Sequence, residues 1–485
     1  MADEVELKLE LSLSAAEALQ RSGVLPGAPR ITRHRSVYFD TPDHQLAAAG
    51  LSLRIRTDGD NRIQTVKAGG APAAGLFARP EWEMPVEDDR PLLDDATPVR
   101  AMLGQTADAV EPLFDVLVER RTWMIDLDGA TIEVVLDRGD AVAGDRRSPV
   151  CEIELEQKSG RPEALFTLAR QIDRAAPVRL GVLTKSERGY HLLAAPEEAV
   201  KAEPIQLTAD IDAAQAFQHI ARACLRQFRL NEMLLRGERS PAALHQARVA
   251  LRRLRSAFSL FQTMLGDSRF DRLREETRWL AGTLGDARDI DVMIARNEHE
   301  DFRARLEEAR ARAYAAAEAA LESDRARSLM LDLAEWIAVG EWLHLPQPRP
   351  LREQSARLFA AEALDRFRRK VKKQGRDLAE LDDEARHEVR KAAKKLRYAS
   401  EFFRALFDDK RQRRRYKRFV SALEELQDRL GALNDLVTAP SLLERIRLID
   451  APGAAVLIAA SNKRKLLDTA ADAHAALVDA KRFWR

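Results

Sequence analysis

Several features that would define other protein classes are scarce in this sequence of 485 residues. It has two cysteines, Cys151 and Cys224, which argues against a disulfide framework and favours a reducing compartment. No run of 18 apolar residues occurs, and the first 30 residues lack the basic and then apolar order of a signal peptide. These absences predict a cytoplasmic protein with no membrane partner.

Motifs of common nucleotide and nucleic-acid sites are also missing. The sequence has no Gly-x4-Gly-Lys-(Ser/Thr) loop, which argues against a P-loop nucleotidase. It shows neither helix-turn-helix nor zinc-finger spacing. Only Tyr398 and Tyr416 lie near its basic stretches, where single-stranded nucleic acid would favour several stacking aromatic side chains. Nucleic acid is therefore a disfavoured partner.

The net charge of +1 hides opposite charges in the two halves of the chain. Residues 201–485 contain 55 lysines and arginines against 44 aspartates and glutamates, a net charge of +11. By difference, residues 1–200 hold 24 basic and 34 acidic residues, a net charge of −10. This asymmetry suggests two domains: an acidic one suited to metal ions and a basic one suited to a polyanion.

Residues 1–195 are rich in period-two patterns that predict β-strands. The first runs from Glu4 to Leu11, with Glu4, Glu6 and Lys8 on one face and apolar residues on the other. Similar patterns occur at 52–56, 63–67, 79–83, 119–123, 131–137 and 150–156. Turn residues separate several of them, at 58–60, 69–70 and 128–129. Many antiparallel strands with this spacing predict a barrel or a strongly curved sheet.

The charged positions of these strands form sets that share a face. By itself the first strand can be a solvated edge, but carboxylates beside an ammonium also suit a polyanion held through a divalent metal ion. The later sets are Arg54 with Arg56, Thr65 with Lys67, Glu81 with Glu83, and Glu152 with Glu154 and Glu156. Cations and carboxylates lie on separate strands, which suits a substrate clasped by cations on one side and metal ions on the other.

From Ile211 onward helical periodicity dominates, and three prolines at 345–351 divide this half in two. Residues 245–255 match 387–397 at an offset of 142, and 284–289 match 430–435. Two matches in the same order predict duplicated helical subdomains.

Each copy of the repeat carries a basic helix face. At 100° per residue one face holds His245, Arg248, Arg252 and Arg255, and its counterpart holds His387, Arg390, Lys394 and Arg397. A solvated helix face usually mixes both signs of charge, whereas these faces are almost purely cationic and repel themselves unless an anion binds. The pattern favours a phosphate-chain ligand, to which each histidine can donate a hydrogen bond.

These residues resemble two known families. Residues of roughly 209–480 resemble the CHAD domain, a conserved-histidine α-helical domain associated with polyphosphate. Residues of about 1–195 resemble the CYTH (triphosphate tunnel metalloenzyme) superfamily, of which Glu4-x-Glu6-x-Lys8 is the hallmark. Further matches follow in the family's order at 38–41, 53–56, 65–67, 81–83, Arg121, Asp137, 151–156 and Lys185. The combination resembles bacterial two-domain inorganic triphosphatases.

The resemblance implies an α+β protein with three segments. Residues 1–197 would form an eight-stranded antiparallel β tunnel with flanking helices, 198–208 a linker, and 209–485 an all-α duplicated helical bundle. The implied reaction is hydrolysis of inorganic triphosphate to phosphate and pyrophosphate, by positioning and charge stabilisation and with Mg²⁺ or Mn²⁺ as cofactor. The helical domain would bind polyphosphate and associate the enzyme with polyphosphate granules.

The resemblance also assigns roles to residues. Those implied to bind or convert the substrate are Lys8, Arg54, Arg56, Lys67, Glu83, Arg121 and Lys185. The implied metal ligands are Glu4, Glu6, Asp137, Glu152 and Glu154. The implied polyphosphate-binding residues are His245, Arg248, Arg252, Arg255, His387, Arg390, Lys394 and Arg397. The choices between Glu81 and Glu83 and between Arg120 and Arg121 stay open.

Two alternative functions also stay open. The same tunnel could serve an adenylyl cyclase or a thiamine triphosphatase, for which Trp82 and Phe77 are candidate aromatic contacts. The chain could instead be a non-catalytic polyphosphate-binding or granule-targeting protein, although a pure anion binder gains nothing from clustered carboxylates.

Overall fold

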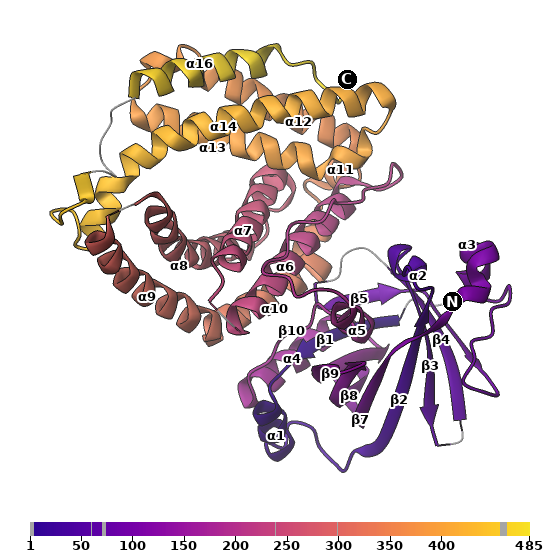
Figure 1. The fold of residues 1–485 in the computed structure, drawn as a ribbon. Coiled ribbons are helices and arrows are strands. Elements are labelled where there is room, and N and C mark those ends of the chain that lie inside the picture. The colour runs from indigo at the N-terminus through magenta and orange to yellow at the C-terminus, as the bar shows by residue number, and fades with distance from the viewer. Residues whose placement is uncertain (1–3, 60, 70–73, 238, 298, 456–462) are drawn as a thin grey trace. The chain divides into compact units, whose positions relative to one another are not determined.

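A computed structural model describes residues 4–59, 61–69, 74–237, 239–297, 299–455 and 463–485 (Figure 1). Contacts divide the chain into two compact units. The first holds Met1–Glu198 and Asp324–Val339, and the second holds Ala199–Ser323 and Gly340–Arg485. The first unit contains the described sheet together with several helices, and the second is helical.

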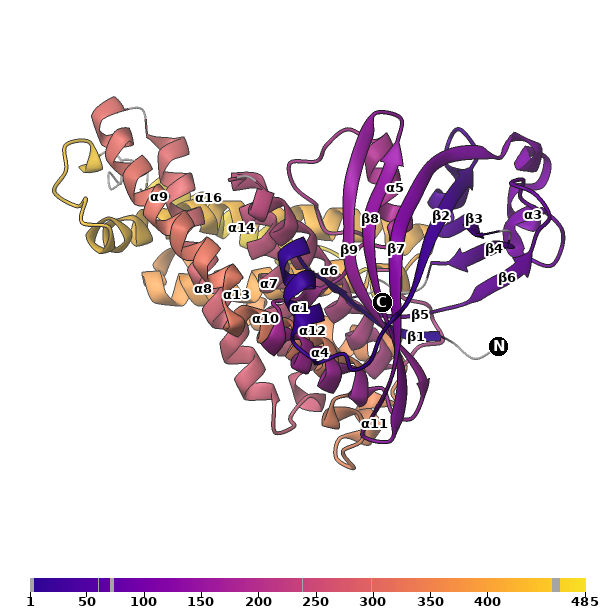
Figure 2. The ribbon, with the colours of Figure 1, turned by 90° about the horizontal axis from the view of Figure 1, so that it is seen from below.

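The first unit is built on one antiparallel sheet, in which the described residues form ten strands. They are β1 (Glu4–Glu10), β2 (Arg30–Asp40), β3 (Leu51–Asp58), β4 (Asn61–Ala68), β5 (Leu76–Arg79), β6 (Glu81–Pro85), β7 (Glu111–Leu127), β8 (Ala130–Ala143), β9 (Arg146–Ser159) and β10 (Arg179–Leu180). Their order is β10-β1-β9-β8-β7-β2-β3-β4-β6, with β5 beside β1. Figure 2 shows the long strands β7, β8 and β9 side by side.

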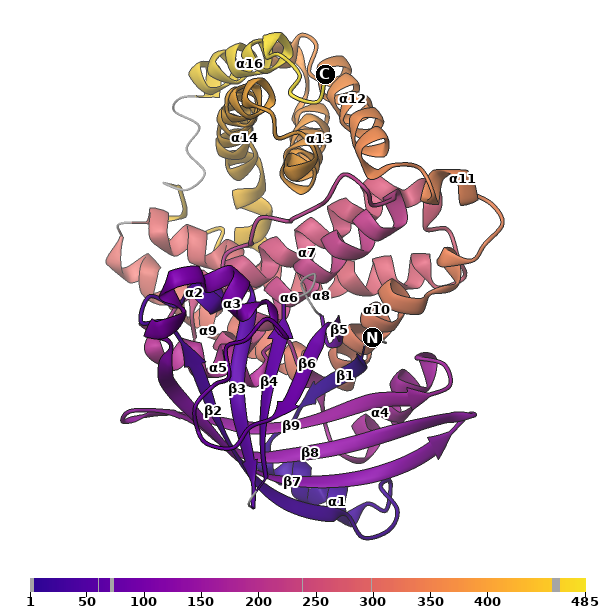
Figure 3. The same ribbon diagram turned by 90° about the vertical axis from the view of Figure 1, so that its right-hand side faces the viewer.

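One extended segment links the two sides of this sheet. β5 pairs with β1, and β6, which follows directly after Pro80, pairs with β4. The Pro80 carbonyl accepts a hydrogen bond of 3.1 Å from the Ala68 amide, so the segment stays attached to β4 where proline interrupts the pairing. The sheet is therefore strongly curled (Figure 3).

The predicted antiparallel, barrel-like sheet with flanking helices is confirmed. The described strands number ten by their pairing, but β5 and β6 form one continuous segment and β10 has two residues. With β5 and β6 counted as one strand and β10 left out, eight strands remain, the number that the family resemblance implies.

The helices of the first unit flank this sheet. They are α1 (Leu13–Arg21), α2 (Gln45–Ala48), α3 (Pro98–Leu103), the 3-10 helix η1 (Gly104–Ala109), α4 (Glu163–Ala175), α5 (Lys185–Leu193) and α10 (Asp324–Val339). Two ion pairs hold α10 on α4, and each helix contributes an arginine to one of them and an aspartate to the other. Arg170 of α4 contacts Asp332 of α10 at 2.8 Å, and Arg327 of α10 contacts Asp173 of α4 at 2.7 Å.

Alternation along the strands separates an apolar face from a polar one. Leu53, Ile55 and Val66 are fully or almost fully buried in a cluster with Phe39 and Leu46. The residues between them, such as those at 54, 56, 65 and 67, point to the opposite face of the sheet. Because the apolar positions fill the outer clusters, the interior of the curled sheet receives the polar side chains.

The second unit consists of helices. They are α6 (Ala213–Gly237), α7 (Pro241–Phe261), η2 (Gln262–Met264), α8 (Phe270–Arg296), α9 (Glu300–Glu322), η3 (Glu341–Leu343), α11 (Arg349–Arg352), α12 (Ala356–Gln374), η4 (Leu378–Glu380), α13 (Asp383–Phe402), η5 (Arg404–Leu406), α14 (Lys410–Arg445) and α16 (Lys463–Asp479). Across the described part of the chain, no helix combines the length and the apolar character that crossing a membrane requires.

The two copies of the predicted repeat fold alike. The first copy lies on α7 and α8, and the second lies on α13 and α14. A Cβ atom on Gly285 would lie 3.3 Å from the Arg248 guanidinium, and one on Gly431 would lie 3.8 Å from that of Arg390. In both copies the missing side chain lets the arginine of the first helix approach the second helix closely, as a duplication predicts.

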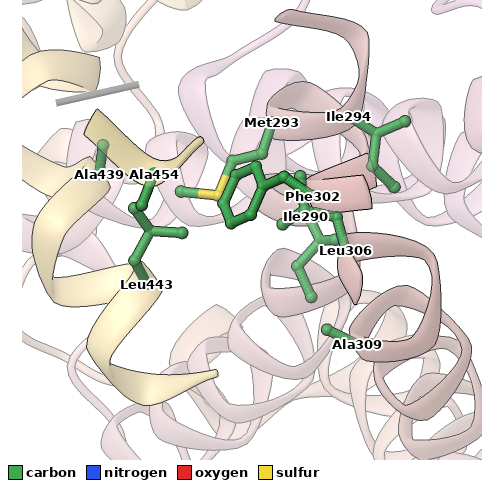
Figure 4. Packing of buried hydrophobic residues seen from close by; sticks show 9 residues of the cluster. All are labelled: Ile290, Met293, Ile294, Phe302, Leu306, Ala309, Ala439, Leu443 and Ala454. Atoms are coloured by element: carbon green, nitrogen blue, oxygen red, sulfur yellow. The ribbon is translucent and has the colours of Figure 1, made fainter. Parts of the chain in front are cut away.

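An apolar cluster connects helices of the two copies. It contains Ile290, Met293, Ile294, Phe302, Leu306, Ala309, Ala439, Leu443 and Ala454 (Figure 4). The first six residues come from α8 and α9, and two others come from α14. Figure 4 shows Met293 and Phe302 between the side chains of α14 and the rest of the cluster. This packing fixes α8 and α14 relative to each other.

Candidate functional site

The interior of the curled sheet encloses a cavity of about 1060 Å³. Cations from several elements line it: Lys8 of β1, Arg54 and Arg56 of β3, Lys67 of β4, Arg120 of β7 and Lys185 of α5. Five of these were predicted from the sequence. Glu6, Glu81, Glu83 and Glu154 line the same cavity. The alternating strands therefore deliver both signs of charge to one enclosed space.

Three carboxylates meet at one wall of this interior. Asp137 of β8 is paired with Glu152 of β9, and Lys8 of β1 is paired with Glu154. One oxygen each of Asp137, Glu152 and Glu154 lies within 4.8 Å of the other two. Asp137 and Glu152 are fully buried. An all-oxygen set of this size suits a hard divalent cation such as Mg²⁺ or Mn²⁺.

Three cations share these carboxylate oxygens. Lys8 Nζ lies 3.0 Å from Glu152 Oε1 and 2.6 Å from Glu154 Oε1. Lys185 Nζ lies 2.5 to 2.9 Å from an oxygen of each carboxylate. The Arg120 guanidinium donates two hydrogen bonds to Asp137, at 2.9 and 2.6 Å. The acidic cluster is thus matched by three positive charges of the protein itself.

Local structure fixes the two lysines. Lys185 is the first residue of α5, and Thr184 caps that helix by accepting a hydrogen bond from the Glu187 amide. Lys8 runs beside Gly181, where a Cβ atom would lie 2.5 Å from the lysine Cγ. Glycine at position 181 therefore leaves the space that the Lys8 side chain occupies.

Electrostatic interactions keep the cluster ionised. Burial would raise the pKa of Glu154, but Lys185, Lys8 and Arg120 outweigh it and hold the pKa well below its ordinary value. Burial would lower the pKa of Lys185, yet the three carboxylates raise it well above the ordinary value. At neutral pH the carboxylates therefore carry their charges, which the three cations balance.

The opposite wall carries the remaining predicted cations. Lys67 Nζ lies 2.8 Å from Glu81 Oε2, and Arg56 Nη2 lies 3.5 Å from Glu83 Oε1. Glu83 also accepts a hydrogen bond of 3.2 Å from the Thr65 hydroxyl. Both Glu81 and Glu83 line the cavity, so the structure does not separate the two alternatives that the sequence left open. The Glu4 side chain lies outside the described part of the structure.

The placement of Arg121 differs from the prediction. Its guanidinium contacts Glu119 at 2.9 Å and Gln20 at 2.6 Å, whereas Arg120 lines the cavity. Neighbouring residues of a strand point to opposite faces, so only one of the two arginines can face the interior. The cross-strand partner of Arg120 is Asp137, which belongs to the carboxylate cluster. The geometry therefore favours Arg120 over Arg121 for the substrate site.

The helical unit contains a second site, a cleft of about 590 Å³. Six of the predicted polyphosphate-binding residues line it: His245, Arg248, Arg252, His387, Arg390 and Lys394. Three arginines that the basic-face pattern did not include join them: Arg288, Arg296 and Arg445. Arg288 lies in the repeated segment 284–289, so the repeat could have pointed to it. Arg296 and Arg445 lie outside the repeated segments.

Two predicted residues are absent from the described lining of this cleft. Arg397 lies 3.5 Å from Glu401 and 3.8 Å from Glu424. Arg255 lies near Arg278 and Glu275. Both follow Arg248 or Arg390 by seven residues, which is about 10 Å along a helix, so they share the basic face but lie beyond the end of the cleft.

The cleft has more positive charge than its acidic residues balance. Arg248 contacts Asp289 at 2.7 Å, and Arg296 contacts Asp435 at 3.0 Å. Burial and the surrounding arginines lower the pKa of Lys394 to about 6. Burial and three neighbouring arginines likewise lower the pKa of His245 to about 4. A bound polyanion would relieve this repulsion.

One difference between the two repeats changes the surroundings of their histidines. His387 Nδ1 is 2.7 Å from Asn434 Oδ1, which fixes the orientation of the imidazole ring. The residue equivalent to Asn434 in the first repeat is Arg288, whose charge lowers the pKa of His245. One histidine is therefore held by an amide, and the other faces a cation.

The structure thus has a curled antiparallel sheet with a charged interior, followed by a duplicated helical region with a basic cleft. These are the two parts that the family resemblances in the sequence imply. Residues 2–190 match the family model of the CYTH domain, and residues 219–444 match that of the CHAD domain. The chain therefore contains a CYTH domain followed by a CHAD domain.

Individual proteins show further similarities. An inorganic triphosphatase of Haemophilus influenzae is 29% identical over 209 residues, which cover 40% of this chain and 55% of that relative. The chain therefore spans about half the length of this relative. The solved CHAD domain from the plant Ricinus communis is 30% identical, with a TM-score of 0.49, and the match covers 59% of this chain and 97% of that one. A Hippeastrum protein assigned as an adenylyl cyclase, with a dominant triphosphatase activity, is 18% identical, with a TM-score of 0.29, over 39% of this chain and 95% of that one.

Proposed function

We propose that the protein is a metal-dependent triphosphatase that hydrolyses inorganic triphosphate to phosphate and pyrophosphate. The observation that carries this proposal is that basic side chains line the interior of the curled sheet beside a cluster of three carboxylates, of which Glu154 lines the same cavity. A phosphate chain needs the cations, and the clustered carboxylates offer ligands to a metal ion that accompanies the substrate. The Haemophilus influenzae relative, named an inorganic triphosphatase, supports the same reaction.

The walls of the cavity suggest separate roles. Arg54, Arg56 and Lys67 lie on one side and would bind phosphate oxygens. Asp137, Glu152 and Glu154 would hold Mg²⁺ or Mn²⁺, with Glu6 lining the same cavity. A bound divalent ion neutralises phosphate charge and lowers the pKa of a coordinated water.

Lys8, Lys185 and Arg120 would exchange their contacts with the carboxylates for contacts with phosphate oxygens of the substrate. Their positive charges now lie within hydrogen-bond distance of the same oxygens that a metal ion needs. The carboxylates can hold the ion only if these cations find another anion, and triphosphate supplies it. We therefore expect the metal ion and triphosphate to bind cooperatively.

The reaction needs no covalent intermediate on the protein. Water attacks the terminal phosphorus, the bond from that phosphorus to the bridging oxygen breaks, and pyrophosphate leaves. The fixed arginines and lysines stabilise the negative charge of the transition state and of the leaving pyrophosphate. This mechanism uses positioning and electrostatics, for which the closely packed charges of the cavity are suited.

A nucleotide or thiamine substrate has less support. Of the two aromatic residues that the sequence offered for such a role, Trp82 packs against the outer apolar cluster with Leu53 and Val66. Phe77 is buried and lies under the Lys8 ammonium, 5.9 Å from it. Tyr38 is the aromatic residue among the described residues that line the cavity. A predominantly charged lining favours a substrate that is itself mostly phosphate.

We propose further that the helical cleft binds polyphosphate and can bring the enzyme to polyphosphate granules. Seven lysines and arginines and two aspartates occur among the described residues of its lining. This surplus of positive charge suits a flexible chain of phosphates, since each unit brings one negative charge to a site without a clustered carboxylate set.

The test is a substrate panel with the purified full-length chain. Phosphate release from tripolyphosphate, ATP and thiamine triphosphate is measured with Mg²⁺ and with Mn²⁺, beside binding of polyphosphate. Preference for tripolyphosphate supports the proposal, and preference for either other substrate replaces it. Polyphosphate binding without hydrolysis of any triphosphate would favour the alternative of a non-catalytic polyphosphate-binding protein.

A further inference from the structure

A buried histidine lies between two of the cavity's arginines. His34 is on β2 and lines the cavity. On the same strand, Thr32 is paired with Arg120 of β7, and Ser36 is paired with Arg56 of β3. Residues 32, 34 and 36 share one face of the strand, so His34 lies one step diagonally from each arginine.

The hydrogen bonds of this histidine are incomplete. Its Nε2 atom lies 2.9 Å from the Thr32 hydroxyl. Its Nδ1 atom is buried and has no hydrogen-bond partner among the described residues, although the side chain is only 9% exposed. A histidine with a purely structural role would normally satisfy both ring nitrogens when buried, because an unpaired polar atom is costly. The unpaired nitrogen belongs to a residue that lines the cavity, so a ligand that binds there could supply the missing partner.

The charges around His34 come from three strands. Arg56 and Asp58 lie on β3, Arg120 lies on β7, and Asp137 lies on β8. Burial, together with Arg120 and Arg56, lowers the pKa of the imidazole, and the two carboxylates oppose this only in part. Without an anion the ring is therefore neutral near pH 7, which avoids a third positive charge between the arginines.

We propose that His34 contacts the substrate directly and binds a phosphate of inorganic triphosphate through Nδ1, between Arg56 and Arg120. The inference rests on the proposed triphosphatase function, and it adds a residue that the family motifs in this sequence do not include. Thr32 positions the ring by holding Nε2, so the imidazole can donate from Nδ1 without turning.

This contact couples substrate binding to protonation. A phosphate at Nδ1 stabilises the imidazolium form and raises the pKa of His34 in the complex. Binding of triphosphate then takes up a proton in the pH range between the free and the bound pKa. The affinity for triphosphate accordingly rises as the pH falls through that range.

The experiment compares three variants with the wild-type chain. His34→Ala removes the contact, and His34→Asn keeps a hydrogen-bond donor near the Nδ1 position without a charge. His191→Gln, at an exposed position of α5, is the matched control. For each protein, tripolyphosphate hydrolysis is measured with Mg²⁺ from pH ~5.5 to ~8.5. Calorimetry in two buffers of different ionisation enthalpy gives the number of protons taken up on binding.

We expect His34→Ala to raise KM for tripolyphosphate roughly tenfold at the acidic end, with a smaller change in kcat, and to lower the proton uptake below that of the wild type. His34→Asn should recover much of the affinity but not its pH dependence. The control should match the wild type. Should His34→Ala fail to fold, the lower proton uptake in His34→Asn supplies the test.

Two results would overturn the inference in distinguishable ways. If both His34 variants keep the wild-type KM and proton uptake at every pH, His34 does not contact the substrate, and the triphosphatase proposal stands. If the wild-type chain neither binds nor hydrolyses tripolyphosphate, both proposals fail.

Discussion

The cavity of the sheet and the cleft of the helices are both basic, but they balance their charges differently. Among the described residues that line the cavity, nine are lysine or arginine and seven are aspartate or glutamate. In the described lining of the cleft the numbers are seven and two. A site with both signs of charge can hold a metal ion and a phosphate chain together. A site in which basic residues greatly outnumber acidic ones is suited to the anion alone. Under the proposed function, the cavity would be the site of hydrolysis and the cleft a site of attachment.

Of the substitutions that test this comparison, Glu154→Gln should have the largest effect on triphosphatase activity. It removes one charge from the carboxylate cluster and leaves Lys8 and Lys185 with fewer partners, so we expect triphosphatase activity to fall at least ~1000-fold. Polyphosphate binding by the cleft should be unchanged. Phosphate release and polyphosphate binding are measured on the same sample, with circular dichroism as a check on folding. An active variant would remove the carboxylates from the mechanism.

Two neighbouring arginines give the next test. Arg120→Ala should reduce kcat/KM for triphosphate by roughly 100-fold, because it removes a cation from the cavity. Arg121→Ala is the matched control on the opposite face of β7 and should change kcat/KM less than about threefold. The reverse order of effects would contradict the register of β7 in the sheet.

Arg120 also shows how much of the site could be predicted from the sequence. The turn at Asp128-Gly129 separates two strand patterns, and a two-residue hairpin there pairs position 120 with position 137. The structure has this pairing. Since Asp137 was predicted to face the interior, the hairpin register would have selected Arg120 over Arg121. Alternation shows which residues of a strand share a face. The pairing register with the neighbouring strand is needed to decide which of the two faces points into the interior.

Other features depended on tertiary packing. Arg296 and Arg445 reach the cleft because the apolar cluster of Met293 and Leu443 holds α8 and α14 together. No periodicity within one helix reports such a contact. The association of α10 with α4 likewise depends on ion pairs between residues 154 and 162 positions apart in the sequence. In contrast, the curled antiparallel sheet and the helical repeats followed from alternation and internal matches alone.

The third test concerns the cleft. Arg390→Ala should weaken polyphosphate binding roughly tenfold and reduce its salt dependence, while triphosphatase activity stays the same. Arg397→Ala is the matched control on the same helix, since Arg397 lies beyond the end of the cleft beside Glu401. Equal losses in the two variants would mean that the whole basic face of α13, rather than the cleft, binds the chain.

The smallest expected effect is a pH dependence of the cleft. The pKa of Lys394 is lowered from 10.5 to about 6, so between these values the unfolded chain binds more protons than the folded one, and the free energy of unfolding rises with pH. A polyanion raises this pKa again. Polyphosphate affinity should therefore increase as the pH falls from ~8 to ~6, by less than about tenfold over the whole range.

Lys394→Arg separates this effect from other titrations. Arginine keeps its charge throughout this range, so the variant should bind polyphosphate with a flatter pH profile than the wild type. Fluorescence anisotropy of a labelled polyphosphate at constant ionic strength gives both profiles. Parallel profiles would show that Lys394 is not the titrating group.

The most direct test of the central claim is the metal dependence and the product ratio of tripolyphosphate hydrolysis by the wild-type chain. The arrangement of carboxylates and cations predicts equal amounts of phosphate and pyrophosphate in the presence of Mg²⁺ or Mn²⁺, and loss of both products when the metal is chelated. Hydrolysis that continues unchanged with a chelator, or the absence of any hydrolysis with either metal, would contradict it.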